Sequence, residues 1–353
     1  MHSGNMGMLF QKITDLPSLK IGAGRQGWVD IAKAISISLL VAWHWCRTTY
    51  LPNELLIFVR MPLFLLVAGF FMRKALVGGW KPFLKSKTGH FLYLFVLWSW
   101  IIYFTANVPM RVYNNLDLDY LYLLRIFYNP PSTIWFLYAL LIISLLTKLV
   151  KNVPFWILLL VSIILYSWNT LSGEWFDLSI FDRIIRLIPF FFIGVFGLEK
   201  ITLFVCRWKN YWLLFFIAYW PLAYLTYFGL LARIGPVTFM VSIIGLVWVL
   251  LLSKWIDDSR FSKVIAYVGA SSLYIFVMHR IPMTYFESTR WIFPKLYEQG
   301  MLALVIDMFI VFIIIITCAF SGRYLHNKGY TRFLFQIPWP KETRGNNRTS
   351  PTS

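Results

Sequence analysis

The chain has 353 residues, of which 59% are apolar and only 14% are charged, and its mean hydropathy is +0.66. Soluble domains are typically about half apolar and about a quarter charged. The composition therefore excludes a soluble globular enzyme and a disordered chain, and it predicts a polytopic membrane protein. The formal charge of +18 does not require nucleic acid as a partner, because cytoplasmic loops of membrane proteins carry an excess of Lys and Arg.

Ten apolar runs are long enough, or nearly long enough, to cross the ~30 Å hydrocarbon layer, which takes about 20 helical residues. Lipid cannot satisfy free backbone groups, and the runs are continuous rather than alternating, so we expect helices and not a barrel. The expected fold is all-α, a bundle of about ten transmembrane helices. The runs are 29–46, 55–72, 89–107, 134–150, 153–169, 183–198, 211–228, 236–253, 262–282 and 301–320.

The distribution of positive charge predicts the orientation. With the N-terminus inside, 23 of the 33 Lys and Arg residues fall in or beside cytoplasmic segments, which predicts that both termini are cytoplasmic. We expect a cytoplasmic N-terminal segment at 1–28, a membrane domain at 29–320 and a basic cytoplasmic tail at 321–353. The three cysteines lack the spacing of a metal site, so no bound metal is expected.

The first apolar run carries charged and titratable residues, which cost ~2.5–3.5 kcal/mol each at membrane depth and so suggest function. Lys33 and His44 are eleven residues apart, about three turns plus 20°, so they share one helix face about 16 Å apart along the axis. Asp30 lies one turn below Lys33 and can pair with it. His44 is then a general base or an acyl relay in a polar channel that Lys33 lines from below. The alternative is an interfacial His44 and a Lys33 that snorkels to the cytoplasm.

A basic residue and a His separated by ten residues on the first helix, followed by four later motifs in order, resemble the membrane-bound acyltransferase-3 family over roughly residues 25–320. Each motif alone is mostly aromatic and aliphatic, but their order together with ten helices is fairly specific. The four later motifs are Arg60-Met-Pro-Leu-Phe-Leu-Leu-Val-Ala-Gly-Phe-Phe71, Trp135-Phe-Leu-Tyr-Ala-Leu140, Ile188-Pro-Phe-Phe-Phe-Ile-Gly194 and Gly269-Ala-Ser-Ser-Leu-Tyr-Ile-Phe-Val-Met-His279.

The resemblance implies an O-acyltransferase with His44, Lys33 and Asp30 as its catalytic group. It implies transfer of an acyl group, usually acetyl, from cytoplasmic acetyl-CoA to a hydroxyl of an exopolysaccharide, an O-antigen or a lipid-linked sugar. Acetyl-CoA is then a substrate rather than a permanently bound cofactor. The implied location is a bacterial cytoplasmic (inner) membrane, with membrane lipid and other polysaccharide-assembly proteins as further partners.

Members of this family usually carry an Arg-x-x-Arg pair at the cytoplasmic start of the third helix, proposed to hold the phosphates of coenzyme A. The corresponding stretch here begins at Lys85, with Lys87 and His90 at positions i and i+3. We expect this stretch to be a helix N-terminus, where the macrodipole favours an anion, with contributions from Arg73 and Lys74. Lys binds phosphate as a point charge and lacks the fork of Arg, so the phosphate contacts differ from the family pattern. The alternative is that these cations only mark topology.

Five residues near the outer helix ends are candidates for binding the acceptor: Arg60, Trp135, Arg183, Arg186 and His279. His279 is expected at the depth of His44. Its alternative role, like that of Trp135, is an interfacial residue; such aromatics commonly form a belt at the headgroups.

Two acidic residues matter for the outer half of the bundle. Arg60 lies inside an apolar run and needs an acidic partner, for which Glu54 is favoured by depth. Asp307, well inside the last run, either orients His44 or His279 or makes a structural hydrogen bond between helices.

Two other classes of protein remain open at this stage. A transporter or flippase for a glycan or lipid precursor would also use ten helices and buried cations, although the chain shows no paired inverted halves. A basic membrane scaffold would not require Lys33 and His44 to share a face.

Overall fold

The computed structural model describes residues 27–46, 50–119, 121–130, 133–172, 179–231, 234–292 and 300–338. All regular elements in these ranges are helices, as the composition predicts. Residues 1–26 and 339–353, which make up much of the two expected cytoplasmic segments, lie outside the described residues.

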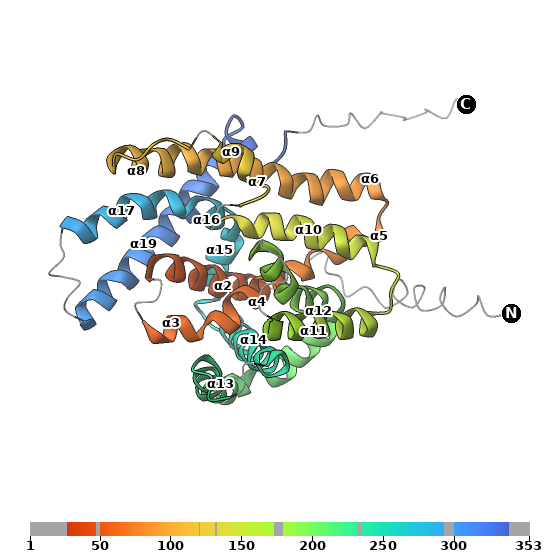
Figure 1. Ribbon diagram of the computed structural model, residues 1–353. Helices are drawn as coiled ribbons and strands as arrows, with labels where there is room; N and C mark the ends of the chain where they lie inside the picture. Colours follow the sequence, from red (N-terminus) through yellow and green to blue (C-terminus); the bar gives the residue numbers. More distant parts are fainter. Residues whose placement is uncertain are drawn as a thin grey trace, which may run out of the picture.

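The ten apolar runs all coincide with helical segments (Figure 1). These helices are α2 (Gly27–Cys46), α4 (Ile57–Phe70), α7 (Gly89–Ile102), α10 (Trp135–Leu149), α11 (Phe155–Ser172), α12 (Ser179–Trp208), α13 (Trp212–Tyr227), α14 (Gly235–Asp257), the series α15 (Ser262–Ala270), α16 (Ser272–Met278) and α17 (Arg280–Ile292), and α19 (Gly300–Asn327). Shorter helices connect them: α3 (Leu51–Leu55), α5 (Arg73–Val77), α6 (Trp80–Phe83), η1 (Leu84–Thr88), η2 (Tyr103–Asn107), α8 (Val108–Tyr113), α9 (Tyr122–Arg125), η3 (Lys209–Tyr211) and η4 (Arg332–Leu334).

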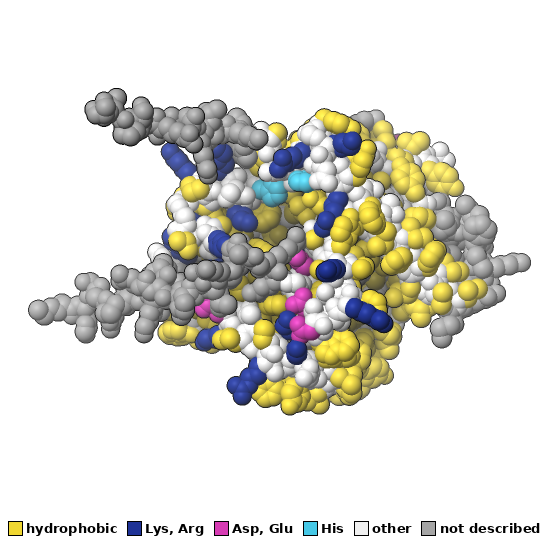
Figure 2. All heavy atoms as spheres, turned by 180° about the vertical axis from the view of Figure 1, so that it is seen from behind, with side chains coloured by type: hydrophobic (Ala, Val, Ile, Leu, Met, Phe, Trp, Pro, Cys, Tyr) yellow, Lys and Arg dark blue, Asp and Glu magenta, His cyan; other side chains and the backbone are white. Residues whose placement is uncertain are grey.

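Five helical segments in the described part of the chain are long and apolar enough to cross a membrane: Gly27–Cys46, Trp80–Tyr113, Ile180–Tyr227, Gly235–Asp257 and Leu302–Asn327. Three shorter apolar helices lie at Ile57–Phe70, Trp135–Leu149 and Phe155–Thr170. Hydrophobic side chains also cover broad areas of the surface (Figure 2). The protein is therefore a helical membrane protein, while about ten crossings and two cytoplasmic termini stay predictions.

Helix α2 lies at the centre of the bundle. It packs against α4, α14, α15, α16 and α19, and none of its residues is exposed. The approach of α15 is especially close, because a side-chain carbon on Gly269 would overlap the backbone carbonyl of Asp30. The helix that carries Lys33 and His44 is thus held on several sides by protein.

Helices α4 and α12 cross at a pair of glycines. A side-chain carbon on Gly194 would overlap the carbonyl oxygen of Leu66, and one on Gly69 would come within 2.6 Å of the carbonyl oxygen of Phe191. Small residues permit such close backbone contact between membrane helices. This crossing fixes α4, and with it Arg60, against the rest of the bundle.

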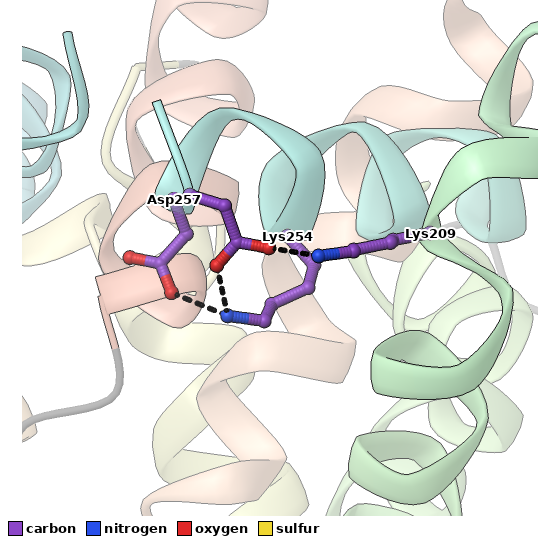
Figure 3. A network of polar contacts seen from close by, with 4 residues as sticks. Lys209, Lys254 and Asp257 are labelled. Atoms are coloured by element: carbon purple, nitrogen blue, oxygen red, sulfur yellow. Dashed lines mark hydrogen bonds and ion pairs between the residues drawn. The ribbon is translucent and has the colours of Figure 1, made fainter. Parts of the chain in front are cut away.

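An ionic network joins η3 to the C-terminal end of α14 (Figure 3). Asp258 pairs with Lys209 and with Lys254, 2.7 Å from the latter, and Lys254 also lies 3.1 Å from Asp257. Asp257 in turn lies against Gly27, because a side-chain carbon on that glycine would overlap its carboxylate. The network therefore links the start of α2 to the ends of two other helices.

We expect the Asp258→Asn variant to have a lower Tm than the wild type at neutral pH. Hydrogen bonds from Lys209 and Lys254 lower the pKa of Asp258 below its ordinary value of 3.8. A lowered pKa means that the ion pairs stabilise the fold above the pKa of the unfolded chain, ~3.9, and that this stability is lost as the pH falls through the folded-state pKa. Thermal unfolding in detergent should be measured over a pH series for both proteins. The Tm difference between wild type and Asp258→Asn should be steady from pH ~7 to ~5 and should narrow below pH ~4. A difference that persists at the lowest pH would contradict this role of the charge.

Candidate active site

Two histidines from different helices meet inside the bundle. His44 lies in the last turn of α2, and His279 follows the end of α16. Their ring centroids are 5.2 Å apart and the ring planes are inclined by 32°. His279 is completely buried, whereas His44 is partly buried. The expectation that these two histidines lie at the same depth is confirmed, although their chemical roles stay predictions.

The tryptophans on either side of His44 are both held by charged residues of other helices. The guanidinium of Arg60 lies 4.3 Å from the ring centroid of Trp43. On the other side, Trp45 donates a hydrogen bond from its indole nitrogen to Asp307, at 2.6 Å, and the Tyr50 hydroxyl donates to the second carboxylate oxygen, at 3.0 Å. Asp307 therefore makes the interhelical hydrogen bond foreseen as one of its two roles, and it restrains the residue next to His44.

Near the N-terminal end of α2, Lys33 pairs with Asp30 at 2.5 Å, as the spacing predicts. Its ammonium group also lies 5.2 Å from the ring centroid of Phe71. The face between Lys33 and His44 does not form the expected polar channel, because Ile37 and Leu40 on that face are buried apolar side chains. A helix at the centre of a bundle packs its apolar residues against its neighbours, and this packing closes the path.

Arg60 is buried, with 4% of its surface exposed. It donates a hydrogen bond of 2.5 Å to the carbonyl oxygen of Asn53, and Glu54 is the carboxylate whose charge attracts it. Glu54 also accepts a hydrogen bond of 3.1 Å from the Tyr227 hydroxyl. The partner expected from depth is thus the one that acts on Arg60, and Arg60 is enclosed by protein in this state.

Three other candidates for acceptor binding lie on α10 and α12. Arg183 is exposed, and its guanidinium lies 5.5 Å from the ring centroid of Trp135. Arg186 is committed to structural contacts, because it donates to Asn169 at 2.5 Å and pairs with Asp182 at 3.2 Å. Arg183 is therefore the exposed cation of the three with no such ion pair among the described contacts, and it lies over the largely buried ring of Trp135.

A group of phenylalanines connects this region to the histidine pair, and the sequence does not single it out. Phe136 packs against Phe276 at a centroid distance of 5.6 Å and against Phe64 at 4.6 Å. Phe276 lies 6.2 Å from the ring of His279. Each of the three phenylalanines lies within one of the motifs that resemble the family, but the motifs do not indicate that they meet.

The structure around Lys87 and His90 differs in one respect from the phosphate site that the sequence predicts. Lys87 and His90 do not lie at a helix N-terminus, because α6, η1 and α7 run on without interruption and Thr88 has helical backbone angles. The amide groups there are used within the helix, so the macrodipole argument is wrong for this position. The stretch instead contains the π-helical turn η1, a feature that is frequent at functional sites.

The cations around this stretch are differently placed. Lys74 and Lys85 are exposed, Lys87 and His90 are partly buried, and Arg73 pairs with Glu199 at 2.7 Å. On the face drawn in Figure 2, several Lys and Arg side chains lie around a hollow, with two His side chains on one side of it and Asp or Glu side chains on another. The exposed Lys74 and Lys85 are the cations of this stretch that an anionic ligand can reach.

Lys148 is a buried cation whose role the sequence does not indicate. Only 1% of its surface is exposed, and its ammonium group donates to the carbonyl oxygens of Leu76, at 2.6 Å, and of Gly78. The rings of Trp80 and Phe83 lie 5.9 and 5.2 Å away. It therefore fixes the turn between α5 and α6.

These features define a helical membrane protein with a histidine pair inside the bundle and exposed cations at its surface. A family model described as an acyltransferase domain, that of acyltransferase-3, matches residues 26–323. The chain belongs to the acyltransferase-3 family and is a membrane acyltransferase. Neither the comparison with curated proteins nor that with solved structures gives a match.

Proposed function

We propose that the protein is an O-acetyltransferase of a bacterial cytoplasmic membrane, which moves acetyl from acetyl-CoA to a hydroxyl of a surface glycan or a lipid-linked sugar. Membership of the acyltransferase-3 family supports acyl transfer. The observation that carries the proposal is the position of His44, on the central helix and next to His279. A partly buried imidazole inside a membrane protein is a suitable proton acceptor near neutral pH.

In the proposed reaction, His44 removes the proton from the acceptor hydroxyl while the oxygen attacks the thioester carbonyl. The new carbon–oxygen bond forms, the carbon–sulfur bond breaks, and the thiolate of coenzyme A leaves. The imidazolium of His44 then returns its proton to that sulfur. The products are an acetyl ester and free coenzyme A, and His44 ends as it began.

The two substrates reach His44 from opposite directions in this proposal. The cations Lys85 and Lys87, with His90, attract the phosphates of the donor, and Lys33 lies three helical turns from His44 on α2. Because Ile37 and Leu40 close the face above Lys33, the acyl-carrying arm has to displace these side chains when it binds. Arg183 offers the acceptor an exposed cation beside the ring of Trp135, which suits sugars with anionic substituents.

The proposal is tested with membranes that contain the protein and acetyl-CoA labelled in the acetyl group. We expect the label to appear on membrane-associated glycan in an ester that mild base releases. Membranes from the same host without the protein serve as the control. Equal labelling of the two preparations would contradict acetyl transfer and would favour a transporter or a scaffold.

A further inference from the structure

His279 is held in one tautomer by the backbone of its own helix. Its Nδ1 atom lies 2.8 Å from the carbonyl oxygen of Phe276 and 3.1 Å from that of Ile275. A carbonyl oxygen only accepts hydrogen bonds, so Nδ1 carries the proton. The Nε2 atom of a neutral ring is then left with a lone pair and can only accept.

That Nε2 atom is buried and has no hydrogen-bond partner among the described residues. Buried polar atoms in proteins nearly always have a partner, and an exception calls for an explanation. The ring of His44 lies at a centroid distance of 5.2 Å, at which an edge-to-edge approach brings ring nitrogens within hydrogen-bonding distance. The absence of a hydrogen-bond donor to Nε2 of His279 is therefore explained if that donor forms at only one stage of the reaction.

The geometry points to His279 as a positioning residue for His44, whose Nε2 atom accepts a hydrogen bond from the His44 ring once that ring is protonated. This inference rests on the proposed function. A protonated imidazole donates from both nitrogens, whereas a neutral one donates from only one. The lone pair of His279 thus gains its partner when His44 takes the proton of the acceptor hydroxyl.

The proton balance of the reaction is unchanged by this role. The hydroxyl proton moves to His44 and then to the leaving thiolate, while His279 keeps its proton on Nδ1 throughout. The backbone carbonyls that accept the hydrogen bond from Nδ1–H polarise the ring and strengthen Nε2 as an acceptor. His279 thereby orients His44 as the carboxylate of a catalytic triad orients its histidine, but without a negative charge in the membrane.

Two substitutions separate the two nitrogens of His279. In His279→Asn the amide nitrogen replaces Nδ1 and still donates to the carbonyls, but the acceptor is lost. In His279→Gln the amide oxygen reaches the position of Nε2 and keeps an acceptor there. We expect His279→Asn to lower kcat by about 10- to 100-fold with the KM for acetyl-CoA within about twofold of wild type, and His279→Gln to keep at least about tenfold more activity than His279→Asn.

The Tm of each purified variant shows whether the fold is kept. Equal activities of the two variants, whether both lowered or both normal, would overturn the inference. If the wild type itself transfers no label, the proposed function is wrong. If the wild type is active and the two variants have equal activities, only the role of His279 is wrong.

A measurement on the wild type needs no variant to fold. Nitrogen-15 spectra of protein labelled in histidine should show one residue with a protonated Nδ1 and a bare Nε2, assigned to His279 by magnetisation transfer along the backbone. A proton on Nε2 of His279 in the free protein would overturn the inference.

Discussion

The His44→Ala variant should be inserted and folded but should transfer acetyl at least 10²- to 10⁴-fold more slowly than wild type, because a positioned general base contributes about this factor. His44 is partly buried, and the flanking Trp43 and Trp45 keep their contacts with Arg60 and Asp307 in its absence. Removal of the imidazole should therefore cost little stability. The rate is measured with labelled acetyl-CoA, and the fold by Tm and by the elution profile in detergent.

His326→Ala is the matched control for this loss. His326 lies in the last turn of α19, where its ring centroid is 5.7 Å from that of Tyr274 and 6.3 Å from that of Phe335. It has no part in the proposed reaction, so its variant should transfer acetyl at a rate within a few-fold of wild type. Undiminished transfer by His44→Ala would remove His44 from the mechanism.

Replacement of Gly269 by Ala should lower both the stability of the protein and its rate of acetyl transfer. The added carbon would overlap the backbone carbonyl of Asp30, and backbone cannot rotate away as a side chain can. Overpacking of this kind typically costs about 1–3 kcal/mol and shifts the neighbouring element. Since α2 is that element, we expect a Tm lower by several degrees together with a lower rate of transfer.

Gly329→Ala provides the comparison, because no atom lies within 4 Å of a side-chain carbon placed there. Its Tm should equal that of the wild type. A Tm for Gly269→Ala that matches this control would show that α15 and α2 are not in close backbone contact in the folded protein.

Local patterns in the sequence predicted most of the fold. Every apolar run became helix, because hydropathy and helical geometry in a membrane are decided within about 20 residues. The pairing of Lys33 with Asp30 followed from the rise of one helical turn. The similar depth of His44 and His279 followed from the place of each within its own apolar run.

Features that depend on packing between distant segments were missed. The continuation of α7 back to Trp80 was hidden because the polar stretch 85–90 interrupts the hydropathy pattern that marks a span. Burial of Lys148 depends on carbonyl groups some 70 residues earlier, and the hydrogen bond of Asp307 to Trp45 spans 262 residues. Apolar closure of the face between Lys33 and His44 depends in the same way on the neighbours of α2.

The central claim is that the imidazole of His44 promotes movement of acetyl from a thioester to a hydroxyl. It is tested most directly by following labelled acetyl-CoA with purified protein in vesicles that hold the glycan acceptor, comparing wild type, His44→Ala and protein-free vesicles. The account predicts a time-dependent increase in glycan-bound label with the wild type, and label at the protein-free level with the variant. Equal rates for the wild type and His44→Ala, or no label above the protein-free level with the wild type, would contradict it.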